Sequence, residues 1–173
     1  MEVRKLLTIL GGIITLVATY IFSWFVVDDA GTLYYGHGLG VLFSLPYTFA
    51  NAETIAASWG SGVPFFVLYI VGGCLILFLF SGVLILLGVK SRAVSIIGAI
   101  MPIGIALAVI SGPFSIPPNV IDYIQPFSSE ALGVFPIHLA IGPSGYGASV
   151  ALGNYLLLAG GILGFVGGVI PRK

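Results

Sequence analysis

The sequence predicts an all-α integral membrane fold: an up-down bundle of four transmembrane helices with a small outer cap of short β-strands and a short helix. Two observations predict the bundle. Only 7% of the 173 residues are charged and the mean hydropathy is +1.16, whereas soluble domains carry about 25% charged residues. Four stretches also lack every Asp, Glu, Lys, Arg and His, and each approaches or exceeds the roughly 20 residues that cross a bilayer as a helix.

These stretches place the predicted spans at about residues 6–27, 64–89, 93–111 and 149–170. Two long loops, residues 28–63 and 112–148, join them in pairs, so that residues 1–173 form a single membrane domain. The first apolar stretch is longer than the roughly 7–15 residues of a signal-peptide core. It is therefore expected to remain as an uncleaved anchor.

The charges predict the orientation in the membrane. All six Lys and Arg residues lie at the termini or in the short link between the second and third spans, and five of the six Asp and Glu residues lie in the long loops. Basic residues mark the cytoplasmic side. We therefore expect a multi-pass protein of the cell membrane, with both termini cytoplasmic and both long loops outside.

Both outer loops are rich in apolar residues, which must be buried somewhere. The run Leu33–Phe49 predicts a short hairpin around a Gly-His-Gly centre, and Asn51 is a candidate N-cap for a short helix in "NAETIAASW". In the second loop the prolines prevent a long helix, and Ser128 is an N-cap candidate before the extended segment "LGVFPIHLAIG". The loops are expected to form a cap over the bundle and a docking surface.

Small residues form stripes along the first and fourth predicted spans. Such stripes let helix backbones approach closely, with hydroxyl groups available to bond across the contact. They predict packing within the bundle, with contact to another subunit or a second copy as the alternative. The residues are Gly12, Thr15 and Thr19 in the first span and Gly153, Gly160, Gly164 and Gly168 in the fourth.

No charged residue and no histidine lies within any predicted span. Ion paths and proton relays need ionisable groups at depth, and haem within a membrane needs axial ligands such as His. A pump, an antiporter or a bis-His cytochrome built from this chain alone is therefore not expected. The sequence also has no catalytic motif, which favours a protein that is not an enzyme.

His37 and His138, both in the outer loops, are the candidate metal ligands. Together with the outer carboxylates they have the chemistry of a copper, zinc or iron site. Neither belongs to a spaced ligand motif, so the alternative is an imidazole satisfied within a turn or by a backbone carbonyl. No cofactor is predicted, with a metal or a quinone as the open alternative.

Other features bear on the source and family of the chain. The single cysteine, Cys74, lies within the second span and no Asn-x-Ser/Thr acceptor occurs, which favours a prokaryotic source or outer loops that are covered by partners. Four spans with a large first outer loop resemble claudin-type proteins, although their outer tryptophan and cysteine-pair signature is missing here. The segment Ser81–Ile100, "SGVLILLGVKSRAVSIIGAI", resembles the passage between the second and third helices of DoxX-type proteins, some of which associate with quinone-linked sulfur oxidation.

The function predicted first is that of a non-catalytic, accessory subunit of a larger membrane protein complex, of a respiratory or other energy-converting kind. It would contact the lipid bilayer and other membrane subunits, through its glycine-faced helices and apolar outer loops, and no nucleic acid. A claudin-like surface or adhesion protein that self-associates as a homo-oligomer is one alternative. A DoxX-like quinone-linked or metal-binding subunit of a membrane oxidoreductase is the other.

Overall fold

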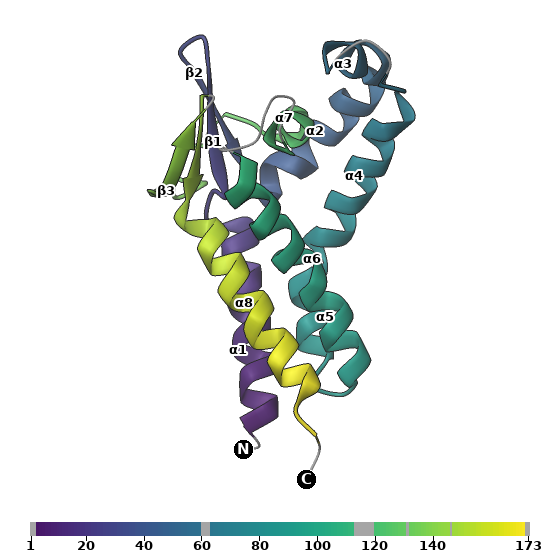
Figure 1. Cartoon of the computed structure of the whole chain (residues 1–173), viewed down its shortest axis with the longest axis vertical. Coiled ribbons are helices and arrows are strands. Elements are labelled where there is room, and N and C mark those ends of the chain that lie inside the picture. The colour runs from purple at the N-terminus through teal and green to yellow at the C-terminus, as the bar shows by residue number, and fades with distance from the viewer. Residues whose placement is uncertain (1–2, 60–62, 113–119, 131, 146, 172–173) are drawn as a thin grey trace.

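The computed structural model describes residues 3–59, 63–112, 120–130, 132–145 and 147–171, which are mostly helical with one small antiparallel sheet (Figure 1). The strands are β1 (Phe25–Asp29), β2 (Thr32–Gly36), β3 (Ala140–Gly145) and β4 (Ala148–Ala151). The helices are α1 (Val3–Tyr20), α2 (Gly38–Ala50), α3 (Ala52–Ser58), α4 (Phe66–Leu79), α5 (Ser81–Leu87), α6 (Arg92–Ser111), α7 (Val120–Ile124) and α8 (Leu152–Val169), with a 3₁₀ turn, η2 (Gln125–Phe127).

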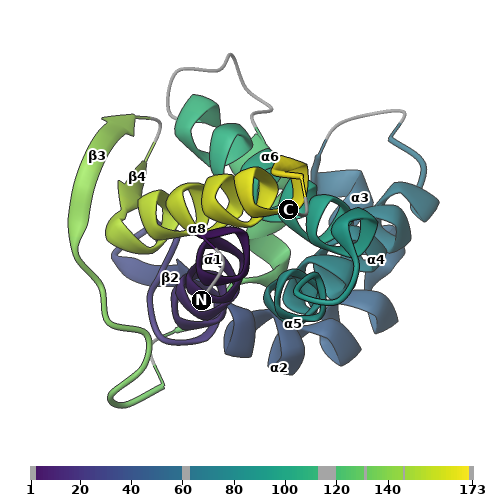
Figure 2. The same cartoon turned by 90° about the horizontal axis from the view of Figure 1, so that it is seen from below.

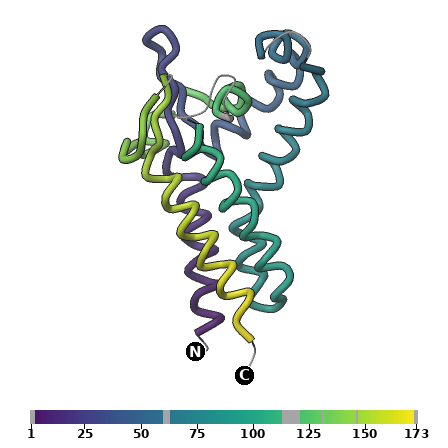
Figure 3. Tube along the Cα trace, viewed as in Figure 1, coloured from purple at the N-terminus to yellow at the C-terminus, as the bar shows by residue number. Residues whose placement is uncertain are grey.

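Among the described residues, three helices are each long and apolar enough to cross a membrane, namely α1, α6 and α8. The second predicted span, residues 64–89, is not one helix. It is broken at Phe80 into α4 and α5, which are bent by 42° and pass the same test only as a pair. Figure 3 shows the change of direction along this part of the chain.

The predicted first span is wrong at its outer end, because α1 stops at Tyr20 and the chain continues into β1. Residues 22–27 are aromatic and β-branched as well as apolar, which favours a strand, and hydropathy alone does not distinguish the two. Trp24 ends the helix: its indole Nε1 donates to the Ala18 carbonyl at 3.0 Å, one of the carbonyls that a helix end leaves without a partner. The predicted fourth span likewise begins within β4.

We call the end of the molecule at which the two chain termini lie the inner end, and the opposite end the outer end (Figure 1). At the inner end, four helices pack in a ring. Helix α8 lies between α1 and α6, and α5 completes the ring by packing on α1 and α6 (Figure 2). Helix α4 diverges from this ring toward the outer end, where it packs mainly against α2 and α3. The outer half of the molecule is thus filled by loop segments rather than by a fourth parallel helix.

The predicted small residues lie inside this ring. A Cβ on Gly160 would lie 2.5 Å from Thr15 Oγ1 and 2.8 Å from Thr15 N, so α1 and α8 meet backbone to backbone. The other glycines contact different neighbours: Gly12 and Gly164 face α5, Gly168 faces α6, and Gly153 faces the Ser23 carbonyl. The glycines of the fourth span form one stripe in the sequence, but each contacts a different neighbour within the chain.

The threonine hydroxyls do not bond across the helix contact, in contrast to the expectation. Thr15 Oγ1 donates to the Gly11 carbonyl at 2.8 Å and Thr19 Oγ1 to the Thr15 carbonyl at 2.7 Å, both within α1. Hydrogen bonds between α6 and α8 come from other side chains. Ser95 Oγ of α6 donates to the Gly164 carbonyl at 2.7 Å, and Asn154 Nδ2 of α8 donates to the Ala106 carbonyl at 3.0 Å.

Arginines at the inner end satisfy the last carbonyls of neighbouring helices. Arg92 donates from Nε to Gly168 O at 3.0 Å and from Nη2 to Val169 O at 2.6 Å, which caps α8. Arg4 donates to Val89 O, just beyond α5, at 2.7 Å. A cation at a helix C-terminus interacts favourably with the helix dipole. The two arginines therefore stabilise the packing of the helix ring at its inner end.

The sheet has the strand order β2-β1-β4-β3, all antiparallel. The hairpin predicted within Leu33–Phe49 lies earlier: β1 and β2 form it, and they turn at Ala30 and Gly31, both of which have positive φ (51° and 89°). Two central residues with positive φ are typical of the tight turns that suit the twist of antiparallel strands.

The segment after this hairpin is helical rather than extended. Helix α2 occupies Gly38–Ala50, and the predicted short helix follows as α3. Asn51 makes no N-cap hydrogen bond to α3 and instead donates from Nδ2 to Tyr47 O in α2 at 2.8 Å. Ser128 likewise follows η2 rather than starting a helix.

The helix contact gives a direct prediction. Gly160→Leu places a side chain where α1 and α8 touch, and is expected to destabilise the protein by about 1–3 kcal/mol or more, as overpacking does. Thermal unfolding of the purified protein in detergent measures this. Gly104→Leu in α6 is the matched control, because a Cβ there meets no atom within 4 Å. Equal melting temperatures for the two variants would contradict the packing.

Candidate functional site

The two candidate histidines lie in the outer part of the molecule, at junctions between the two outer loop regions. His37 is fully buried, not exposed at a turn, and is the N-cap of α2. Its Nδ1 accepts from the Gly40 N–H at 3.4 Å, and its Nε2 lies 3.1 Å from Ser129 Oγ. Because Nδ1 accepts, we assign the proton of the neutral ring to Nε2, which donates to Ser129.

Glycines make room for this ring. A Cβ on Gly40 would lie 2.7 Å from Ser129 Oγ and 2.9 Å from His37 Nε2, and one on Gly38 would lie 2.8 Å from the Thr19 carbonyl at the end of α1. The first turn of α2 can therefore rest directly on the imidazole and on α1. The "GHGLG" motif at residues 36–40 is a helix start packed against its surroundings.

His138 makes a second, similar junction. Its Nδ1 lies 2.8 Å from Ser23 Oγ, and its ring meets the Tyr35 ring edge-on at a centroid distance of 5.2 Å. Backbone bonds hold the two segments together, since Ser23 N donates to Ile137 O at 3.2 Å and Ile137 N donates to Ile21 O at 2.8 Å. His138 therefore bonds a serine hydroxyl, rather than the backbone carbonyl that the sequence suggests as its partner.

One backbone pair links the two junctions. Tyr35 and Ser129 exchange N–H···O bonds of 2.8 and 3.2 Å, so the Tyr35 that packs on His138 is paired to the Ser129 that bonds His37. Each ring is engaged by a serine, and no group of three or more His, Cys, Asp or Glu side chains that could hold a metal ion occurs in the described part of the chain. Both serine–histidine contacts join the N-terminal half of the chain to the second outer loop.

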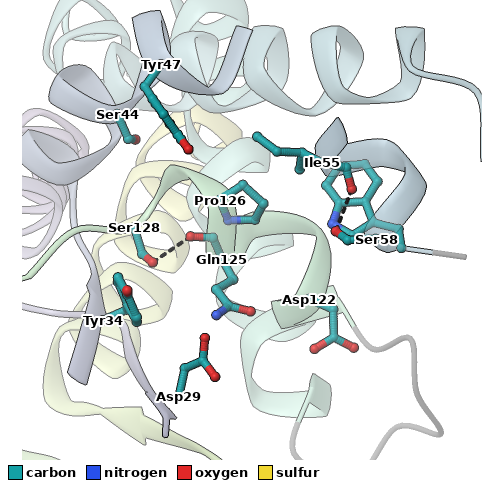
Figure 4. A pocket seen from close by; sticks show the side chains of 11 residues that line it. Asp29, Tyr34, Ser44, Tyr47, Ile55, Ser58, Asp122, Gln125, Pro126 and Ser128 are labelled. Atoms are coloured by element: carbon teal, nitrogen blue, oxygen red, sulfur yellow. Dashed lines mark hydrogen bonds between the residues drawn. The ribbon is translucent and has the colours of Figure 1, made fainter. Parts of the chain in front are cut away.

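A separate cleft of about 690 Å³ opens on the outer side, between the β1–β2 hairpin, α2, α3 and the α7–η2 segment (Figure 4). It holds two carboxylates, of which Asp29 points toward the side-chain amide of Gln125, while Asp122 projects from α7. Aromatic and apolar side chains complete its walls. The lining residues are Asp29, Tyr34, Ser44, Tyr47, Ile55, Ser58, Trp59, Asp122, Gln125, Pro126 and Ser128.

No motif in the sequence predicts this cleft. The charge pattern marked its carboxylates as outer residues, but Asp29 and Asp122 come from different loops and no spacing rule joins them. Trp59 lines the cleft and packs edge-on against Tyr123 at a centroid distance of 5.0 Å. These residues come together only because the second loop, with α7 and η2, packs beside α2 in the folded chain.

The buried histidines predict a pH-dependent stability. Burial lowers the pKa of His37 to about 4 and also lowers the pKa of His138. The unfolded chain titrates near 6.5, so it binds more protons than the folded chain below that pH. The free energy of unfolding is therefore expected to fall as the pH drops from about 6.5 toward 4, by up to about 1.4 kcal/mol per pH unit from His37. His138 shifts it in the same direction.

Melting temperatures in detergent between pH 7 and pH 4 measure this dependence. His37→Asn keeps an N-cap acceptor but cannot be protonated, and is expected to melt with a flatter pH dependence. His138→Gln tests the second junction in the same way. If both variants lose stability with acid as steeply as the wild type, the histidines do not cause the dependence.

The candidate site thus combines two serine–histidine junctions, which hold the outer loops together, with an acidic, aromatic cleft beside them. The junctions are held by hydrogen bonds, and the carboxylates of the cleft attract cations. The claudin-type and DoxX-type resemblances rest on the sequence features given above. Comparison with protein-family models, with curated proteins and with solved structures finds no match for this chain.

Proposed function

We propose that this chain is a four-span membrane protein that serves as a non-catalytic subunit of a larger membrane complex. The four spans would be α1, the bent pair α4–α5, α6 and α8. Helix α5 has only seven residues, far too few to cross about 30 Å of hydrocarbon alone. The pair covers residues 66–87, about 33 Å at 1.5 Å per residue before the bend, and so supplies one crossing.

The charge distribution supports cytoplasmic termini. The inner ends of α1 and α8 lie together (Figure 1), and the basic residues of the sequence gather at this end, at the termini and in the link between α5 and α6. The outer loops contain carboxylates and no Lys or Arg. This arrangement follows the rule that Lys and Arg remain on the cytoplasmic side.

The observation that carries the subunit proposal is an exposed apolar segment at the outer end. Val134 is 80% exposed, and Ile137, Leu139 and Ile141, at alternate positions leading into β3, are each about half exposed. Contiguous exposed apolar surface of this kind marks an interaction site. The glycine-faced helices, by contrast, are already occupied by packing within the chain.

The partner for this segment is a protein rather than lipid. β3 is an edge strand, and no described strand pairs with its outer side. Unpaired backbone N–H and C=O groups cannot face hydrocarbon, whereas another chain can pair with them and cover the apolar side chains. The outward side chains of α2, such as Leu42 and Phe43, are different. A helix satisfies its own backbone, so this face suits the outer leaflet of the membrane.

Self-association is the second candidate, because an edge strand can pair with its own copy. The quinone-linked or metal-binding alternative has no corresponding observation among the described residues. Extraction in mild detergent separates the first two: the accessory subunit is expected to purify in fixed stoichiometry with larger chains, and the self-associating protein as a homo-oligomer. Purification as a clean monomer would contradict both.

The edge itself can be tested by mutation. Ile141→Asp in β3 is expected to reduce the recovery of co-purifying chains at least tenfold, since it buries a charge against the partner. Leu33→Asp in β2 is the matched control, because Leu33 is 45% exposed on the opposite edge strand and should leave recovery unchanged. Quantitative mass spectrometry of the purified material gives the ratio. Equal losses for the two variants would exclude the β3 edge as the docking site.

A further inference from the structure

The cleft beside the hairpin has a strongly one-sided charge. Asp29 and Asp122 line it, and the sequence has no Lys or Arg between residues 6 and 89 or between residues 93 and 171. The outer half of the chain therefore supplies no ammonium or guanidinium group to this space. Two carboxylates in a partly enclosed cavity favour a cation from outside.

The serine hydroxyl groups of the cleft add acceptors rather than donors. Ser128 Oγ donates to Gln125 O and Ser58 Oγ to Ile55 O, both at 2.6 Å, as drawn in Figure 4. Ser44 Oγ donates to Val41 O at 3.2 Å. Because each serine proton is used by the backbone of its own turn, the oxygens present lone pairs to the cavity. The lining thus favours a ligand that brings hydrogen-bond donors.

The remaining walls are aromatic and apolar. Tyr34, Tyr47 and Trp59 line the cleft together with Ile55, and Trp59 is held by its edge-on contact with Tyr123. Aromatic faces attract cations within about 6 Å, and they also accept an apolar group. The volume of about 690 Å³ lies within the range of sites for small organic ligands.

We propose that this cleft binds an organic ammonium ion, meaning a protonated primary or secondary amine attached to an apolar body. The carboxylates and serine oxygens would accept its N–H groups, and the aromatic walls would cover the body. This assignment does not depend on the subunit proposal. The amine has two possible sources, a soluble amine or the ethanolamine headgroup of a lipid, because α2 places the cleft beside its membrane-facing surface.

Three matched probes test the chemistry on the purified full-length protein. 2-Phenylethylamine is protonated and carries N–H donors, its N,N,N-trimethyl derivative keeps the charge without donors, and 2-phenylethanol has neither. Calorimetry or the change in tryptophan fluorescence gives the affinities. The amine is expected to bind at least tenfold more tightly than either analogue, as charge-assisted hydrogen bonds require. Equal affinities for all three probes would overturn the proposal.

Isosteric variants locate the site. Asp29→Asn and Asp122→Asn are each expected to weaken amine binding about tenfold, and the double variant more. Asp28→Asn is the matched control: it removes the same charge from the neighbouring residue of β1, which does not line this cleft. Unchanged amine affinity in both cleft variants, with melting temperatures equal to wild type, would show that any binding lies elsewhere and would refute the assignment.

The source of the amine is distinguished in lipid nanodiscs. If the ligand is a headgroup, nanodiscs containing phosphatidylethanolamine should suppress 2-phenylethylamine binding relative to phosphatidylcholine nanodiscs, and Asp122→Asn should abolish that difference. If the ligand is a soluble amine, the affinity should be equal in both lipids and still fall in the Asp variants. Binding that ignores both the lipid and the variants would overturn the proposal from either source.

Discussion

The close approach of α1 and α8 is the constraint on which the rest of the structure depends. Where they cross, Gly11 of one helix faces Gly160 and Gly164 of the other, and no side chain separates the backbones. Strands continue from both helices at their outer ends, since β1 follows α1 and β4 precedes α8. The helix contact therefore brings these strands together, and Phe25 and Val150 pair directly above it. The sheet is an extension of the helix pair rather than a separate cap.

The same contact explains the asymmetry of the molecule. The sheet stands over α1 and α8, and on the other side α4 diverges from α6 (Figure 3). Helix α2 and η2 fill the intervening space, with Thr48 Oγ1 donating to Pro126 O at 2.7 Å and Phe49 packing on Phe127. The cleft lies where these two halves of the outer end meet. Its carboxylates belong to opposite sides of that boundary, Asp29 to the hairpin and Asp122 to α7.

The helices α1, α6 and α8 could be predicted from the sequence, because hydropathy identifies apolar segments that are long enough to cross a membrane. The outer ends could not. Residues 22–27 and 149–151 are as apolar as the helices they adjoin, so hydropathy extended the spans into strands. In Leu33–Phe49, aromatic content suggested a hairpin, whereas His37 and its glycine neighbours start a helix. The break between α4 and α5 at Phe80 contains no proline that would predict it. The cleft depends on contacts between residues almost a hundred positions apart, which no local pattern encodes.

The pairing of β1 with β4 has a consequence for the order in which the protein is assembled. Synthesis proceeds from the N-terminus, so β1 and its hairpin are produced long before residues 148–151 exist. Until then the edge of β1 that pairs with β4 has no partner strand. Ser23 and Tyr35 likewise have not yet made their contacts with His138. The outer end can close only after the second outer loop has been synthesised, when β4 pairs with β1 and α8 meets α1. Completion of the last helix and closure of the outer surface are therefore one event in biogenesis.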